Sequence, residues 1–202
     1  MADFGRYGVS KLLPATEVQD AIILCAKTVN LNLSQSIHPI GKREEWLRLH
    51  TAIESWQVCL VKEVQPILAI NGVKAADSED ISTSFPVVIY TNRADFYTSF
   101  LYHLSCLLLL KGRPHSLRRM KTACLKTIPW HSVQLSGISR SNRLPWSWDP
   151  IVTTALLFAG KSLSYCGQQN EMMQHLQALS VLTGWKMRKE IEKLKEFWRA
   201  GQ

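Results

Sequence analysis

Two histidines come closest, among the side chains of this sequence, to a catalytic or metal-binding group. His103 and His131 each lie among aromatic and aliphatic residues. An imidazole changes its charge near neutral pH, so it can serve as a general acid, a general base or a metal ligand. A histidine on an apolar helix face is more often a packed core residue than a ligand or catalyst. We therefore expect both side chains to be buried in the core.

The other four histidines carry no stronger signal. His50 falls on the side of its helix opposite to the Trp46 stripe, so we expect it to be exposed. His38, His115 and His175 have no flanking residues at the spacing of metal ligands. The sequence therefore predicts no metal-binding residue among them.

The cysteines do not form a metal site either. The sequence holds five, at positions 25, 59, 106, 124 and 166, and no two are close enough to form a zinc-ligand pair. The number is odd, and four of the five lie among apolar residues. These features predict buried, free thiols in a reducing compartment.

Nucleophilic and phosphate chemistry find no support in the spacing of residues. No Gly-x-Ser-x-Gly elbow is present. The run Ala159-Gly160-Lys161-Ser162 is like the tail of a phosphate-binding loop, but the first glycine of that pattern is missing, and position 155 holds alanine. We therefore predict that the chain is not an enzyme, with no catalytic and no cofactor-binding residues and no cofactor.

Composition and charge limit the classes of protein that fit. The chain has 202 residues, 46% of them hydrophobic, and a net charge of +8. Five basic residues lie between positions 111 and 121, where a nuclear-import or phosphate-contact patch competes with a solvated helix start. The other basic residues are scattered.

The longest purely apolar run, 106–110, is far shorter than the ~20 residues of a membrane helix. Residues 1–10 have no apolar core of a signal peptide, so we expect an intracellular, soluble protein.

Hydrophobic spacing then predicts the elements that would carry these side chains. Apolar residues recur every three or four positions, as in the stripe from Trp46 to Val64. The expected helical segments are 16–29, 43–64, 93–111, 115–127, 130–138, 149–163, 168–182 and 185–198, with breaks at 30–39 and a bend at Pro129. These indicate an all-α fold: a single domain of about eight helices over 16–202, after an irregular segment 1–15, with no significant sheet.

One segment is rich in β-branched residues. Residues 85–90 read Phe-Pro-Val-Val-Ile-Tyr, but this run has no evident partner elsewhere in the chain. We expect it to be an extended segment that lies against the helices. Residues 73–84 are polar and are expected to form an exposed loop.

The last third of the chain has the most characteristic order of residues. A turn, Trp148-Asp149-Pro150, is followed by a helix with Ala159-Gly160, then by Gln168-Gln169, by Thr183-Gly184-Trp185 and by a closing Trp198. Earlier in the chain, Tyr97, Tyr102 and His103 precede Leu109-Leu110, and His131 precedes Gly137-Ile138. Over about 46–198, this order resembles the regulatory region of fungal-specific transcription factors of the binuclear zinc cluster family.

The resemblance implies a helical domain that regulates transcription in the nucleus, with a protein partner or a small-molecule effector. The six-cysteine cluster that binds DNA in that family is missing from this chain. We therefore expect no specific DNA binding by this chain alone, and no membrane association. A truncated gene product and a stand-alone regulator both remain open. The alternative from another class is a helical small-ligand-binding protein or an enzyme, whose apolar pocket the leucine-rich helix 93–111 could line.

Overall fold

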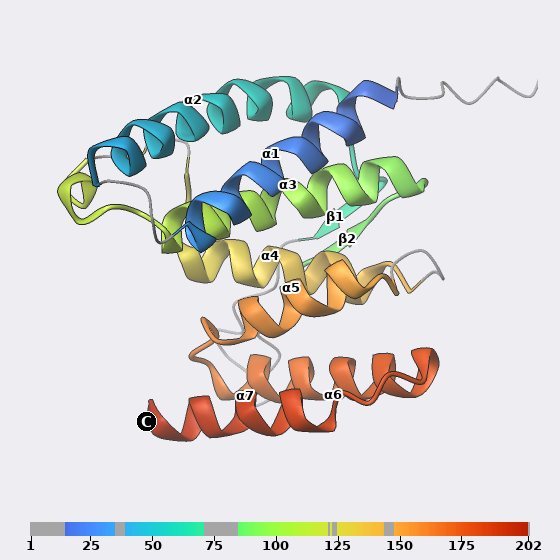
Figure 1. Ribbon diagram of the computed structural model, residues 1–202. Coiled ribbons are helices and arrows are strands. Elements are labelled where there is room, and N and C mark those ends of the chain that lie inside the picture. Colours follow the sequence, from blue (N-terminus) through green and yellow to red (C-terminus); the bar gives the residue numbers. More distant parts are fainter. Residues whose placement is uncertain are drawn as a thin grey trace, which may run out of the picture.

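The computed structural model describes residues 15–34, 39–70, 85–120, 122, 125–143 and 148–201. Its helices, shown in Figure 1, are α1 (Ala15–Leu33), α2 (Pro39–Glu63), α3 (Arg93–Lys111), the 3-10 helix η1 (His115–Leu117), α4 (Ile128–Ser141), α5 (Pro150–Gly160), α6 (Cys166–Thr183) and α7 (Arg188–Ala200). The prediction of an all-α fold is confirmed. The exposed loop predicted at 73–84 lies outside the described residues.

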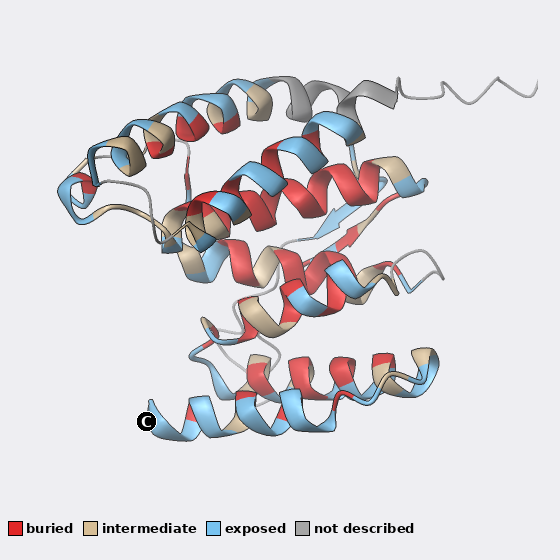
Figure 2. Cartoon of the chain, viewed as in Figure 1, coloured by how far each residue is buried: buried red, intermediate tan, exposed pale blue. Residues whose placement is uncertain are grey.

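Helix α3 is the centre of the fold. Asn92 caps its first turn, because the side-chain Oδ1 accepts the backbone N–H of Asp95 at 2.8 Å. Nearly every residue of α3 up to Leu109 is buried, as Figure 2 shows in red. Helices α1 and α2 lie on one side of it, while α4 and α5 lie on the other, with α6 and α7 beyond them (Figure 1). The helix predicted at 93–111 is therefore confirmed with the same bounds.

Two hydrophobic clusters share this helix. The first cluster includes Phe100 and Leu107 of α3 and reaches α4 to α7. The second includes Tyr102 and Leu109 of α3 and packs against α1 and α2. Trp46 of α2 is fully buried in the second cluster, where its indole Nε1 donates to the Leu109 carbonyl at 2.8 Å. Successive residues of α3 therefore serve both sides of the molecule.

The expectation that 85–90 lacks a strand partner is wrong. Strand β2 (Val87–Ile89) pairs antiparallel with β1 (Leu68–Ile70), with Ala69 opposite Val88. Three residues after Pro66 are too few to show the alternation of a strand, so the pattern gave no sign of β1. On its other edge, β2 bonds to side chains of the α4 end: Asn142 Oδ1 accepts the Tyr90 N–H at 2.9 Å.

The helix expected at 115–127 is not observed: η1 covers only His115–Leu117, and the described residues from 118 to 127 are not helical. Several helix boundaries also differ from the expected ones. Helix α1 continues past the predicted break at Asn30 to Leu33, because Asn32 Nδ2 donates to the carbonyls of Thr28 and Leu108 at 2.8 and 3.1 Å. Helix α2 starts at Pro39, earlier than predicted. Pro129 does not bend a helix but lies in the first turn of α4, where its missing N–H costs no hydrogen bond.

Helix α5 and helix α7 meet closely, as the small residues of α5 suggest. Asp149 caps α5, since its Oδ1 accepts the Ile151 N–H at 2.8 Å, and Pro150 takes the first helical position. A Cβ atom on Gly160 would lie 2.9 Å from Leu194 Cδ2, so only glycine allows this approach without a shift. The apolar face of α7, together with Met187 just before it, packs against the core: Met187, Ile191, Leu194 and Trp198 are buried.

Gly184 ends α6 in the left-handed conformation, with φ 71° and ψ 6°. We expect Gly184→Val to lower the free energy of unfolding by about 1–3 kcal/mol, because a β-branched residue resists this conformation. No atom lies within 4 Å of the Cβ position at Gly184, so the cost comes from the backbone alone. Urea denaturation measures it. Gly184→Asn is the control and should cost less, since asparagine tolerates positive φ; equal losses would contradict the explanation.

No helix in the described part of the chain is both long enough and apolar enough to span a bilayer.

Candidate functional site

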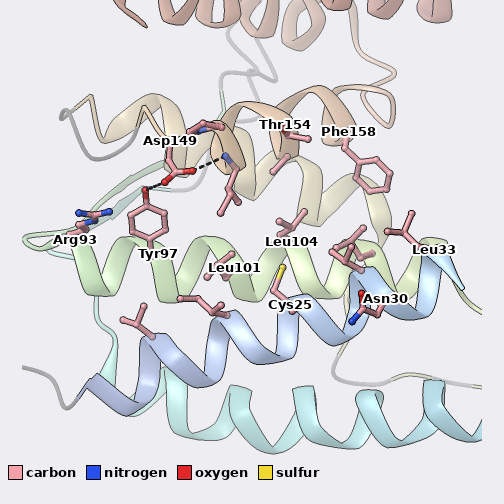
Figure 3. Close-up of a pocket in the computed structure, with 18 of the residues that line it drawn as sticks. Cys25, Asn30, Leu33, Arg93, Tyr97, Leu101, Leu104, Asp149, Thr154 and Phe158 are labelled. Atoms are coloured by element: carbon pink, nitrogen blue, oxygen red, sulfur yellow. Dashed lines mark hydrogen bonds between the residues drawn. The ribbon is translucent and has the colours of Figure 1, made fainter. Parts of the chain in front are cut away.

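A groove between α1, α3 and α5 has a volume of about 1140 Å³. We call it the α1–α3–α5 groove (Figure 3). Its apolar lining residues are Val18, Ile22, Cys25, Ala26, Val29, Leu33, Ala94, Leu101, Leu104, Leu108, Pro150, Ile151, Ala155 and Phe158. The volume is at or above the upper end of ordinary small-molecule sites, about 300–1,000 Å³.

Small side chains on the three helices leave this space open. Ala26 on α1, Ala94 on α3 and Ala155 on α5 all line the groove, where larger residues would close it. The leucines of α3 form part of the lining, as the sequence suggested for an apolar pocket. The rim is exposed to solvent: Ile22, Ile151 and Leu33 are 54%, 52% and 71% exposed. Apolar surface left in water at a concave site is typical of binding sites.

One end of the groove is polar. Tyr97 of α3 donates its hydroxyl to Asp149 Oδ2 at 3.0 Å, and the Arg93 guanidinium carbon lies 5.2 Å from the centre of the Tyr97 ring. Figure 3 shows these three side chains together at the N-terminal ends of α3 and α5. Burial, and next the Asp149 carboxylate, raise the pKa of Tyr97 to about 12. The phenol therefore stays protonated at neutral pH and holds the carboxylate in place.

The opposite end is mostly apolar, with Asn30 of α1 as its one labelled polar side chain (Figure 3). Leu33 and Phe158 line the groove there (Figure 3). Lys111 Nζ lies 4.1 Å from the centre of the Phe158 ring and donates to the Phe158 carbonyl at 3.4 Å. Burial against this ring, and then Lys161, lower the pKa of Lys111. A cation at the C-terminal end of α5 interacts favourably with the helix dipole, which gives Lys111 a structural role.

His103 and His131 are buried core residues, as predicted, and they contact one another. Their Nδ1 atoms are 3.1 Å apart, so one imidazole must donate its proton to the other. Burial lowers the pKa of His131 to about 4, and burial followed by the His131 charge lowers the pKa of His103 well below its usual value. Both rings stay neutral at pH 7. Neither residue lines the α1–α3–α5 groove.

The prediction that His50 is exposed is wrong. His50 is buried, stacks on Trp46 at 5.1 Å between ring centres, and places Nδ1 3.3 Å from Glu54 Oε2. An imidazole four residues from a tryptophan lies over that residue on the same helix face. His175 is buried too, with Nε2 3.0 Å from Ser139 Oγ, while His115 is exposed.

Among the described residues, the other side chains singled out in the sequence do not come together as a chemical site. Cys25 and Cys106 are buried free thiols and Cys166 is exposed, whereas the side chains of Cys59 and Cys124 lie outside the described residues. Burial raises the pKa of Cys25, which disfavours a reactive thiolate in the groove. Within the described ranges, no three histidine, cysteine or acidic side chains gather as metal ligands do.

The segment that is like a phosphate loop lies at the wrong end of its helix. Residues 159–162 form the C-terminal end of α5, whereas phosphate is bound by the N–H groups of a helix N-terminus. Of the basic residues between positions 111 and 121, Arg118 and Arg119 are exposed and Arg113 lies over the Trp46 ring at 5.6 Å. Lys121 lies outside the described residues. This segment therefore includes a packing contact as well as solvated charges.

The groove itself could not be named from the sequence, which predicted no site residues. The one signal was the leucine-rich helix 93–111, whose pattern is the same for a core and for a pocket wall. No protein-family model, no curated protein and no solved structure matches this chain.

Proposed function

We propose that this chain is a regulatory domain of a transcription factor of the fungal zinc-cluster type, and that an apolar effector binds in the α1–α3–α5 groove. The groove is the observation that carries the proposal. It is a large concave site with a mostly apolar lining, whose two charged side chains, Arg93 and Asp149, lie at one end. Such a lining suits binding rather than catalysis, because no acid–base pair faces its centre.

The order of residues in the last third of the chain supports the transcriptional part. Asp149-Pro150 opens α5, Gly160 allows the approach of α7, and Gly184 ends α6. These residues join the helix that borders the groove to the C-terminal helices. An effector that spreads α1 from α5 would therefore act on the packing of α5 against α7, and a partner protein could read that change.

This proposal assigns the chain to the nucleus, without specific DNA contact of its own and with a protein partner that supplies DNA binding. A helical small-ligand-binding protein without a role in transcription is the second candidate, and the same groove favours it. The two differ in whether an occupied groove changes the expression of a gene.

A reporter assay separates the two candidates. The chain is fused to an unrelated DNA-binding module and expressed in fungal cells that carry a matching reporter gene. We expect the fusion to change reporter expression several-fold and to respond to apolar extracts of the growth medium. Ala26→Trp fills the groove and should remove the response to these extracts. Ala178→Trp places the same side chain on an exposed position of α6 and is the control.

An inert fusion at normal protein level would contradict the transcriptional role. If that inert protein still bound apolar compounds in an Ala26-dependent manner, the small-ligand-binding candidate would replace it. Equal responses of the Ala26→Trp and Ala178→Trp fusions would contradict the role of the groove.

A further inference from the structure

We propose that the α1–α3–α5 groove selects an uncharged, elongated apolar molecule that carries one hydroxyl or amide group. This polar group lies between Arg93 and Asp149. This inference rests on the proposed function of the groove and names the chemistry of its ligand. Two features of the groove carry it: its long apolar floor, and the opposite charges of the side chains at its polar end.

The floor of the groove is long, and the side chains that line it between its two ends are mostly apolar. From Tyr97 to Leu108 the central helix α3 advances about 16 Å at 1.5 Å per residue, and the groove follows it. Between these two residues the lining from α3 is Leu101 and Leu104, with Cys25 and Ala155 contributed by the flanking helices. An aliphatic chain or fused apolar rings can displace water along the whole of this length.

The polar end holds one cation and one anion around the same ring. Arg93 lies over Tyr97, and Asp149 accepts the hydroxyl of Tyr97. A carboxylate head would be attracted by Arg93 but repelled by the negative charge of Asp149. An ammonium head would be attracted by Asp149 but repelled by the positive charge of Arg93. Because Arg93 is exposed and Asp149 is half-buried, water screens these like-charge contacts in part, but each still disfavours a charged head. An uncharged head avoids both.

A neutral head can also satisfy both side chains. Asp149 uses Oδ1 for the Ile151 N–H and Oδ2 for the Tyr97 hydroxyl, and each carboxylate oxygen has a second lone pair. Arg93 is exposed and offers several N–H donors. A hydroxyl or primary amide can donate to Asp149 while it accepts from Arg93, which fixes the orientation of the molecule.

The far end of the groove has no charged residue in its lining. Lys111 already donates to the Phe158 carbonyl and covers the Phe158 ring. Its charge offsets the partial negative charge at the C-terminal end of α5. The apolar tail of the ligand therefore ends against Phe158 and Leu33.

A displacement experiment with four compounds of one chain length tests the selectivity. The neutral dye N-phenyl-1-naphthylamine reports the occupied groove, and dodecan-1-ol, dodecanamide, dodecanoate and dodecylammonium compete with it. We expect the alcohol and the amide to displace the dye at concentrations on the order of tenfold lower than either charged compound, a ratio that corresponds to about 1.4 kcal/mol.

Charge-neutral variants assign the selectivity to its two residues. Asp149→Asn keeps a good helix cap and should improve dodecanoate binding about tenfold, with little change for the alcohol. Arg93→Gln should do the same for dodecylammonium. Lys111→Met is the matched control at the other end and should leave the order of the four compounds unchanged, while Ala26→Trp should prevent dye binding and Ala178→Trp should not.

Other results would overturn the inference in distinguishable ways. One such result is that dodecanoate binds most tightly and that Lys111→Met abolishes its binding. This would place an anion site at the far end and refute the proposed selectivity, while binding in the groove would stand. Equal binding of all four compounds would refute the role of Arg93 and Asp149. Absence of dye binding, in a protein whose circular dichroism shows the native helix content, would refute the proposed function of the groove itself.

Discussion

Replacement of Trp198 by alanine should lower the free energy of unfolding by about 3–5 kcal/mol, which is a large part of the about 5–15 kcal/mol of a whole domain. Trp198 is 8% exposed and belongs to the first hydrophobic cluster. Its indole Nε1 donates to the Gly160 carbonyl at 2.9 Å. The variant would lose the buried ring and would also leave this carbonyl without its tryptophan donor.

Thermal and urea denaturation measure this effect against two controls. Lys189→Ala alters an exposed residue of the same helix and should stay within about 0.5 kcal/mol. Trp198→Phe keeps an aromatic ring but loses the Nε1–H donor, so it should fall between the two. A Trp198→Ala protein that melts at the temperature of the parent would show that α7 does not contribute to the folded core.

Acidification should destabilise the domain steeply between about pH 6.5 and pH 4. Burial lowers the pKa of His131 and of His175 to about 4, and for His175 the charges of Arg143 and Arg140 add to this. An unfolded histidine has a pKa of about 6.5. The unfolded state therefore binds more protons in this window, so this contribution to stability is full above about pH 6.5, falls progressively as pH drops, and is lost once pH is below about 4.

The expected slope is about 1.4 kcal/mol per pH unit for each additional proton that the unfolded state binds. His175→Gln keeps a side chain that can bond to Ser139 Oγ, and it should reduce the slope by about one proton. His115→Gln changes an exposed histidine and should leave the slope as in the parent. Urea denaturation at a series of pH values gives both slopes, and an unchanged slope in His175→Gln would contradict the buried, neutral state of His175.

The sequence predicted those features that depend on a few neighbouring residues. Asp149 before Pro150 predicted the start of α5, because a cap and a first-turn proline act over two positions. Gly184 predicted the left-handed end of α6 for the same reason. The stripe of α7 predicted its buried face, since charged residues occupy the rest of that helix.

The features that depend on distant parts of the chain were not predictable in this way. Strand β1 is visible only through its pairing with β2, 19 positions along the chain from Leu68 to Val87. His103 and His131 were each expected in the core, but nothing in their spacing predicted that their Nδ1 atoms meet.

The groove was hidden for a further reason. Ile22 on α1 and Ile151 on α5 fall at helical spacing in the same way as core residues, yet they line an open hollow. A periodic pattern reports which face of a helix avoids water and not whether a neighbouring helix covers that face. Arg93 and Asp149, which define the polar end, come from two different helix starts. Asp149 was singled out only as part of the turn before α5, and nothing in the sequence linked it to Arg93.

The sharing of α3 between the two hydrophobic clusters has a consequence for how the molecule comes apart. Phe100 and Leu107 anchor one cluster, and Tyr102 and Leu109 anchor the other, within less than three turns of one helix. The α1–α2 layer cannot lose its contacts without exposing the helix on which the α4–α7 layer is built. We therefore expect local opening in either half to be linked to global unfolding, so that the described helices unfold as one cooperative unit rather than as two foldons.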